Sequence, residues 1–199
     1  MKEERKCMLI VISGPSGVGK GTIFSRLLAS DPSLTFSVSA TTRSPRNGET
    51  DGVDYFFITE DQYQELVQQD AFLEHATVHG HSYGTLKSQI VEKLEKGLNV
   101  VLDIDPQGAK QVMAQWPDCV SIFLLPPSYD KLRQRLYGRN TDATEEIERR
   151  LKNAKGEIEQ AGMYQYVVVN DGLQVALNQV TAIVTAEKQR TSRYFPVVE

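Results

Sequence analysis

One short segment constrains the fold of this chain more than any other. The apolar run "CMLIVIS" at residues 7–13 leads directly into "GPSGVGKGT" at residues 14–22. A continuous apolar run of this kind is typical of a strand buried on both faces of a parallel sheet. The residues that follow Lys20, "GTIFSRLLAS", predict a helix. A strand, a Gly-x4-Gly-Lys loop and a helix, in this order, form the context in which backbone N–H groups curve around a phosphate.

We therefore predict that the loop binds the phosphates of a nucleotide. Its glycines allow the backbone to approach an anion closely, and Lys20 can reach the β- and γ-phosphates. The alternative, a glycine-rich turn with a chance lysine, does not explain the strand and helix on either side. The predicted contacts are Gly14, Pro15, Ser16, Gly17, Val18, Gly19, Lys20, Gly21 and Thr22.

The loop lacks one expected feature, because Gly21 stands where a hydroxyl normally contacts magnesium. The hydroxyl of Thr22, one position later, is available for a phosphate oxygen instead. Asp103 and Asp105 end the predicted strand "NVVLDID", at the edge of the sheet where α/β proteins bind ligands. Since Mg²⁺ commonly keeps several waters, we expect no direct protein ligand. Phosphate oxygens and waters would hold the ion, and Asp103 or Asp105 would orient those waters.

Strand and helix patterns alternate along most of the 199 residues, which predicts a single α/β domain with a mostly parallel sheet. Residues 41–84 interrupt this pattern with a polar, turn-rich stretch that suggests a small insertion. The spacing of Thr59 and Gln62 within it predicts a capping box at the start of a helix.

Composition narrows the functional class. The net charge of −4 argues against nucleic-acid binding through a basic surface, and no apolar stretch is long enough to span a membrane. Cys7 and Cys119 are far apart and belong to no C-x-x-C pattern, so we expect reduced, buried thiols in a cytoplasmic protein. The sequence leaves the oligomeric state open.

The insertion carries its own candidate anion site. Arg43 and Arg46 are three residues apart and can fork onto one phosphate, while Tyr55 and Tyr83 offer hydroxyl donors. On this segment alone, a solvated loop with ordinary surface charges explains the arginines equally well.

Several motifs together carry a resemblance to a known family. "GPSGVGKGT", "SVSATTRSPRNGE", "DYFF", "FLEHA", "YGT", "LDIDPQG" and "GRNTDATEEIERRL" occur in the order found in guanylate kinases, and the match extends from Gly14 to Asp171. The chain thus resembles a bacterial-type guanylate kinase. The resemblance implies a P-loop kinase fold with a central parallel sheet flanked by helices, an inserted GMP-binding subdomain over residues 38–86 and a helical lid over residues 138–158.

The resemblance also implies individual roles in the transfer of phosphate from Mg²⁺-bound ATP to GMP. The implied catalytic residues are Lys20, Arg43, Arg135, Arg139 and Arg150. The implied GMP-binding residues are Ser39, Arg43, Arg46, Glu49, Tyr55, Glu74, Tyr83, Thr85 and Asp103, and Asn170 corresponds to a position near the adenine of ATP. Phosphoryl transfer concentrates negative charge on the moving group, so arginines on a mobile lid can supply charge on closure.

The chemistry of Glu74 makes sense independently of the family. Guanine presents two adjacent donors, N1–H and the 2-amino group, which one carboxylate can accept together. Adenine would set the lone pair of its N1 against the same negative charge. A site built on such hydrogen bonds rejects analogues strongly, because mispairing leaves buried polar groups without partners.

Other residues receive the simpler interpretation. We expect Arg149 to be a solvated neighbour of Arg150, in a surface pair with Glu145. His75, His79 and His81 match no familiar zinc spacing, so we expect solvated or packed side chains. Two alternatives to a guanylate kinase stay open: another nucleoside monophosphate kinase such as adenylate kinase, and a non-catalytic guanylate-kinase-like interaction module.

Overall fold

The computed structural model describes residues 5–78, 80–138 and 144–196. A five-stranded parallel sheet runs through its centre in the order β2-β7-β1-β8-β9. Its strands are β1 (Leu9–Ser13), β2 (Leu34–Phe36), β7 (Asn99–Asp103), β8 (Val120–Leu125) and β9 (Tyr166–Val169). The run predicted to be a buried central strand is indeed central and buried along its whole length. The predicted fold class, a parallel sheet flanked by helices, is confirmed.

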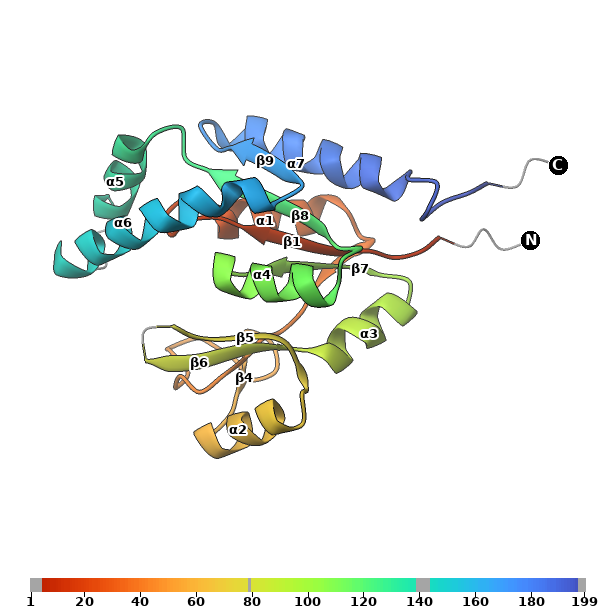
Figure 1. Ribbon diagram of the computed structural model, residues 1–199, viewed down its shortest axis with the longest axis horizontal. Helices are drawn as coiled ribbons and strands as arrows, with labels where there is room; N and C mark the ends of the chain where they lie inside the picture. Colours follow the sequence, from red (N-terminus) through yellow and green to blue (C-terminus); the bar gives the residue numbers. More distant parts are fainter. Residues whose placement is uncertain (1–4, 79, 139–143, 197–199) are drawn as a thin grey trace.

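Helices cover both faces of this sheet (Figure 1). On one face, α1 (Lys20–Ser30) and α7 (Leu173–Lys188) bury Ile23, Leu27 and Val180 against β1 and β8. On the other face, α3 (Lys87–Glu95) and α4 (Pro106–Gln115) contribute Ile90 and Val112 to a second apolar core. Burial on both sides explains why β1 reads as a continuous apolar run rather than an alternating one.

The interrupting segment forms a second sheet in the order β4-β3-β6-β5, with its own small core against α2 (Glu60–Gln68). The strands are β3 (Ala40–Thr41), β4 (Phe56–Phe57), β5 (Phe72–Val78) and β6 (His81–Leu86). The capping box predicted from Thr59 and Gln62 is present at the start of α2. The chain leaves the central sheet after Phe36 and pairs again from Ala40 in the second sheet, so residues 34–39 connect the two sheets rather than forming one strand.

Two further helices project at one end of the central sheet (Figure 1). They are α5 (Tyr129–Tyr137) and α6 (Thr144–Ile158), which pack through Leu132, Leu136 and Leu151. A short 3-10 helix, η1 (Glu159–Met163), continues α6 toward β9. The predicted lid residue Arg139 lies outside the described residues.

The first and last described segments of the chain pair at the opposite end of the molecule from α5 and α6 (Figure 1). Arg5 and Tyr194 form an isolated antiparallel bridge. Behind it, the buried Arg193 donates from Nη1 to Glu187 Oε2 at 2.5 Å and from Nη2 to the Asp118 carbonyl at 2.8 Å. The segment around Arg193 and Tyr194 therefore joins the C-terminal part of the chain to α7, to Asp118 and to Arg5.

Two smaller expectations, on the cysteines and on membrane spans, can also be compared with the structure. Both cysteines are free thiols; Cys119 is buried as expected, whereas Cys7 is only partly buried because it precedes β1 at the margin of the sheet. Among the described residues, no helix combines the length and apolar character that crossing a bilayer requires.

Candidate active site

The phosphate loop has the backbone geometry that its glycines permit. Gly17 and Gly19 take φ angles of 84° and 97°, in a region that other residues rarely adopt. At Gly14, with a φ of 148°, an added Cβ would lie 2.4 Å from the Leu124 carbonyl oxygen. The loop therefore lies directly against the end of β8, at the carboxyl edge of the central sheet.

Two side chains from distant segments hold the loop in this shape. Asn170 Nδ2, just after β9, donates to the Val18 carbonyl at 2.8 Å. Arg135 Nη2 on α5 donates to the Asn170 carbonyl at 2.8 Å, and its Nη1 donates to the Val18 carbonyl at 3.4 Å. The family resemblance implies nucleotide contacts for Arg135 and Asn170, and both side chains contact the loop itself in this structure.

A cavity of about 440 Å³ opens beside the loop. It is lined by residues from the loop, β5, the start of α4 and α6, namely Gly14, Ser16, Lys20, Thr77, Asp105, Gln107, Arg149, Arg150, Asn153 and Glu157. Lys20 Nζ donates to the Gly14 carbonyl at 2.6 Å. Three cationic side chains thus share a space beside the predicted phosphate site, which favours a polyanionic ligand.

The expectation for Arg149 is met only in part: its side chain is 53% exposed and belongs to a surface ion pair, but it has a second location and another partner. Arg149 lines this cavity with Arg150, and its ion-pair partner is Glu146 at 2.6 Å rather than Glu145. Arg150 Nε donates to the other oxygen of Glu146 at 3.1 Å. Consecutive positions on a helix differ by about 100°, so the sequence alone favoured different faces for Arg149 and Arg150, but both side chains line the cavity.

Glu157 was not predicted. It shares the cavity with Lys20, and a hydrogen bond from the Ser16 backbone favours its charged form. Burial nevertheless raises the pKa of the Glu157 carboxyl, with Lys20 opposing that effect. The sequence did contain a signal, since Arg150, Asn153 and Glu157 are spaced at i, i+3 and i+7 and therefore share one face of α6.

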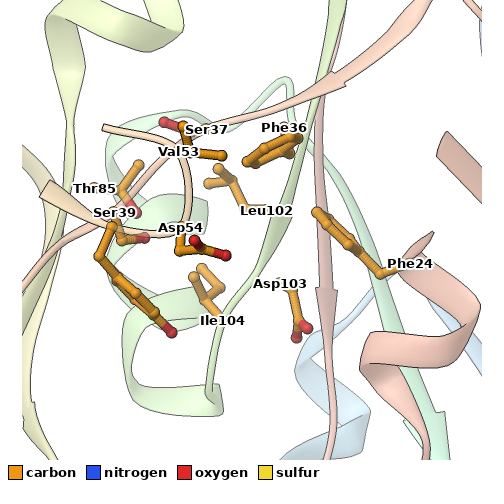
Figure 2. Close-up of a pocket in the computed structure, with 11 residues that line it drawn as sticks. Phe24, Phe36, Ser37, Ser39, Val53, Asp54, Thr85, Leu102, Asp103 and Ile104 are labelled. Carbon is orange, nitrogen blue, oxygen red and sulfur yellow. The ribbon is translucent and has the colours of Figure 1, made fainter. Parts of the chain in front are cut away.

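A second cavity, of about 300 Å³, lies between the central sheet and the inserted segment. Its lining includes four of the predicted GMP-binding residues: Ser39, Tyr55, Thr85 and Asp103. Figure 2 shows Ser39 and Thr85 on one side, Phe24 on the other, and the carboxylates of Asp54 and Asp103 between them. An apolar wall facing hydroxyl and carboxylate groups is a suitable environment for a nucleoside.

Near this cavity, the arginine and tyrosines of the insertion form one cluster. Arg43 Nη2 contacts Glu49 Oε1 at 2.8 Å, and the Arg43 guanidinium lies 5.4 Å from the centre of the Tyr55 ring. The Tyr55 and Tyr83 rings meet edge to face at 6.0 Å between centroids. The hydrogen bond from Arg43 lowers the pKa of Glu49. Arg46 is exposed and joins the cluster through its backbone N–H, which donates to Glu49 Oε2 at 2.7 Å.

Glu74 is only 6% exposed and adjoins the same cavity through its hydrogen-bond partner Thr85, which lines that cavity. A β-bulge between Phe72 and Glu74 shifts the register of β5, so that Glu74 pairs directly with Thr85 on β6. Thr85 Oγ1 donates to Glu74 Oε1 at 2.6 Å. Burial raises the pKa of Glu74 to about 7, and the Thr85 hydrogen bond opposes the rise. The site therefore holds a carboxylate that is costly to ionise until a ligand supplies donors.

The acids proposed to orient magnesium-bound water lie at the carboxyl edge of β7. Asp103 lines the second cavity, where its surroundings raise its pKa through desolvation and Lys20 opposes the rise. Asp105 lines the first cavity while its Oδ1 caps α4 by accepting from the Gly108 N–H at 2.8 Å. Within the described ranges there is no group of three or more His, Cys, Asp or Glu side chains that could hold a metal.

The histidines take ordinary positions where the structure describes them. His75 Nδ1 lies 3.2 Å from the Tyr63 hydroxyl, and His81 is exposed at the start of β6. His79 lies outside the described residues.

A central parallel sheet, a glycine-rich loop at its carboxyl edge, and an arginine-lined cavity define the class of P-loop phosphotransferases. The sequence model of the family described as "Guanylate kinase" matches residues 6–187. The chain belongs to the guanylate kinase family.

Individual relatives agree with this assignment. The chain is 47% identical over 193 residues to a guanylate kinase of Caldanaerobacter subterraneus subsp. tengcongensis, covering 97% of this chain and 94% of that protein. It is 44% identical to a guanylate kinase of Clostridioides difficile, with coverage of 98% and 95%. The crystal structure of guanylate kinase from Anaplasma phagocytophilum matches with a TM-score of 0.77 at 33% identity, covering 96% of this chain and 91% of that one.

Proposed function

We propose that this chain transfers the terminal phosphate of ATP to GMP, giving ADP and GDP, with dGMP as a second acceptor. The observation that carries the proposal is the buried Glu74, held by Thr85 beside a nucleoside-sized cavity in a chain of the guanylate kinase family. Its two oxygens suit the paired donors of guanine. The relatives named above are guanylate kinases, so the family favours GMP over AMP as acceptor.

In this proposal the two cavities hold the two substrates. ATP phosphates bind the loop at residues 14–22, with Asn170 near the adenine and Arg135 against the loop, where it supports the transfer. The GMP base lies beside Glu74, Ser39 and Thr85, while its phosphate is held by Arg43, Arg46, Tyr55 and Tyr83, with Glu49 and Asp103 in the same pocket. Asp103 interacts electrostatically with Lys20, so the two cavities come together where the phosphates must meet.

The chemistry requires charge and position more than a covalent intermediate. The phosphate of GMP is largely ionised at neutral pH, so its oxygen can attack without a protein base. Lys20, Arg149 and Arg150 would stabilise the charge that develops on the transferred group. We propose that residues 138–158, including Arg139, act as the lid, and that residues 38–86 act as the GMP-binding subdomain.

Mg²⁺ fits this cavity as a partner of ATP. Asp105 and Glu157 offer hard oxygen groups, while the described residues hold no cluster that would bind a metal unaided. Phosphate oxygens would therefore supply most of the direct ligands. When bound, the ion would neutralise part of the charge on the phosphates. The carboxylates of Asp103, Asp105 and Glu157 would orient the surrounding water.

Chromatographic measurement of diphosphates tests the proposal. The wild-type protein with ATP and Mg²⁺ should form ADP and GDP from GMP, and should use AMP at least a hundredfold less efficiently in kcat/KM. Equal use of AMP would favour an adenylate kinase. The absence of any diphosphate product would favour a non-catalytic interaction module. The proposal assigns the enzyme to the cytoplasm, in keeping with its free thiols.

A further inference from the structure

The space around the Glu74 carboxylate is closed on one side by a glycine. Gly108 lies in the first turn of α4, buried against β5. A Cβ at this position would lie 2.5 Å from Glu74 Oε2 and 3.2 Å from Glu74 Cδ. Carbon and oxygen atoms do not approach so closely without a bond between them, so no side chain larger than hydrogen fits while Glu74 keeps its position.

The helix that carries Gly108 cannot easily withdraw. Asp105 caps its N-terminus through the Gly108 N–H. One turn further along, Gln111 is joined to the backbone of His75 on β5 by two hydrogen bonds, from Gln111 Nε2 to the carbonyl at 2.8 Å and from the His75 N–H to Gln111 Oε1 at 3.1 Å. These contacts fix the distance between α4 and β5 next to Glu74.

The side chain of Glu74 is the part that can move. Its carboxylate is held by Thr85, which donates from Oγ1 to Glu74 Oε1 at 2.6 Å and also contributes a backbone hydrogen bond. The bulge in β5 and the pairing with Thr85 fix its backbone, leaving its terminal carboxylate as the flexible end. An atom added at Gly108 would therefore displace the carboxylate rather than the helix or the strand.

We propose that Gly108 is a specificity-determining positioning residue: its missing side chain lets α4 press against Glu74 and fixes the carboxylate in the orientation that reads the guanine edge. This inference rests on the proposed function, in which Glu74 binds the base of GMP. Gly108 itself touches Glu74 and not the substrate. It acts through the orientation of two oxygen atoms.

The variant Gly108→Ala tests the proposal. Alanine is a better helix former than glycine, so the change does not weaken α4 itself, and a loss of GMP recognition at an unchanged melting temperature would come from the displaced carboxylate. We expect the KM for GMP to rise at least tenfold and the ratio of kcat/KM for GMP over AMP to fall. The KM for ATP should stay within twofold. Gly162→Ala is the matched control, because a Cβ there has no neighbour within 4 Å.

The pH dependence of GMP binding by Gly108→Ala distinguishes a displaced carboxylate from a partly unfolded protein. Displacing the carboxylate from its buried place beside Thr85 should return its ionisation toward that of an ordinary glutamate. The pH at which GMP binding is half-maximal should therefore move down in Gly108→Ala. An unchanged KM for GMP together with an unchanged profile would overturn the inference.

Two more variants keep the outcome decisive. If Glu74→Gln loses GMP preference while Gly108→Ala does not, the inference fails and the proposed function stands; if Glu74→Gln keeps full preference, the proposed base reading itself fails. Should Gly108→Ala fold poorly, adding Glu74→Ala should restore its stability, because the clash is with that side chain. No restoration would mean that the added methyl meets something else, which also overturns the inference.

Discussion

The phosphate loop at residues 14–22 offers backbone groups from one continuous segment, whereas the cavity beside Glu74 is lined by side chains from widely separated segments. The loop keeps its shape through glycine conformations and through contacts from Arg135 and Asn170. The position of Glu74 depends on the register between β5 and β6, on the close packing of α4 against β5, and on the burial of the carboxylate itself. In the proposed reaction, the donor side would therefore bind what every nucleoside triphosphate has in common, and the acceptor side would tell one base from another.

Lys20→Met should give the largest effect of any single change. Removing the amine takes away the charged donor of the loop, and the loss of one preorganised donor to a developing charge costs about a hundred- to a thousandfold in kcat. GMP binding in the absence of ATP, measured by calorimetry, should stay within twofold. A comparable loss of GMP affinity would contradict the separation between the two sides.

Glu74→Gln should raise the KM for GMP about a hundredfold, because the amide presents a donor to a base edge that also donates. The same substitution should weaken GMP binding but increase the free energy of unfolding relative to wild type at neutral pH. Native Glu74 has a pKa near 7 against 4.5 when unfolded, so the wild type loses stability as pH rises from 4.5 to 7.

Urea unfolding of the two proteins at several pH values measures this difference. The stability of Glu74→Gln relative to wild type should increase across the same interval and level off above pH 7. A flat difference would mean that Glu74 ionises normally in the folded protein.

Arg149→Ala should reduce kcat by about ten- to a hundredfold with little change in either KM, because its charge faces the transferred group only in the closed site. Arg133→Ala on α5 is the matched control: the two side chains are 53% and 55% exposed, and each has a glutamate partner. Equal, small effects in both variants would return Arg149 to the role of a surface residue.

GMP affinity should improve by about tenfold between pH 6 and pH 8, since binding requires ionised Glu74 and its pKa is near 7. The phosphate of GMP also titrates near pH 6. Calorimetric titrations of wild type and Glu74→Gln separate the two, because the variant keeps only the phosphate contribution. Identical pH dependence in both proteins would exclude Glu74 as the source.

Gly21→Ser should have the smallest effect. A side chain at this exposed position meets nothing within 4 Å, so the variant should fold normally. The restored hydroxyl should lower the Mg²⁺ concentration for half-maximal activity, by about two- to threefold, through one additional oxygen ligand. A large gain would mean that the wild-type loop holds the ion poorly and that the carboxylates contribute little.

The same contrast explains what the sequence could predict. The loop, its strand and its helix follow from local pattern, since glycine positions and apolar runs are properties of neighbouring residues. The capping box of α2 and the buried stripe of α6, which includes Leu151, are local in the same sense.

The unpredicted features all depend on how close two distant segments approach. The bulge that sets Glu74 opposite Thr85 has no marker in the sequence, and neither has the contact between Gly108 and Glu74. The surface ion pair of Arg149 was expected but its place in the cavity was not, because helical spacing gives the angle between side chains but not the direction in which the whole helix faces. Family resemblance supplied the role of Glu74, and only the fold explains its raised pKa.

The pairing of Arg5 with Tyr194, secured by the buried Arg193, puts the first and last described residues at the end of the molecule away from α5 and α6. An affinity handle, a fluorophore or a flexible tether joined at either end would therefore extend away from the helices expected to move. The protein can be anchored to a sensor chip by its tail, and nucleotide exchange can be followed on the immobilised molecule.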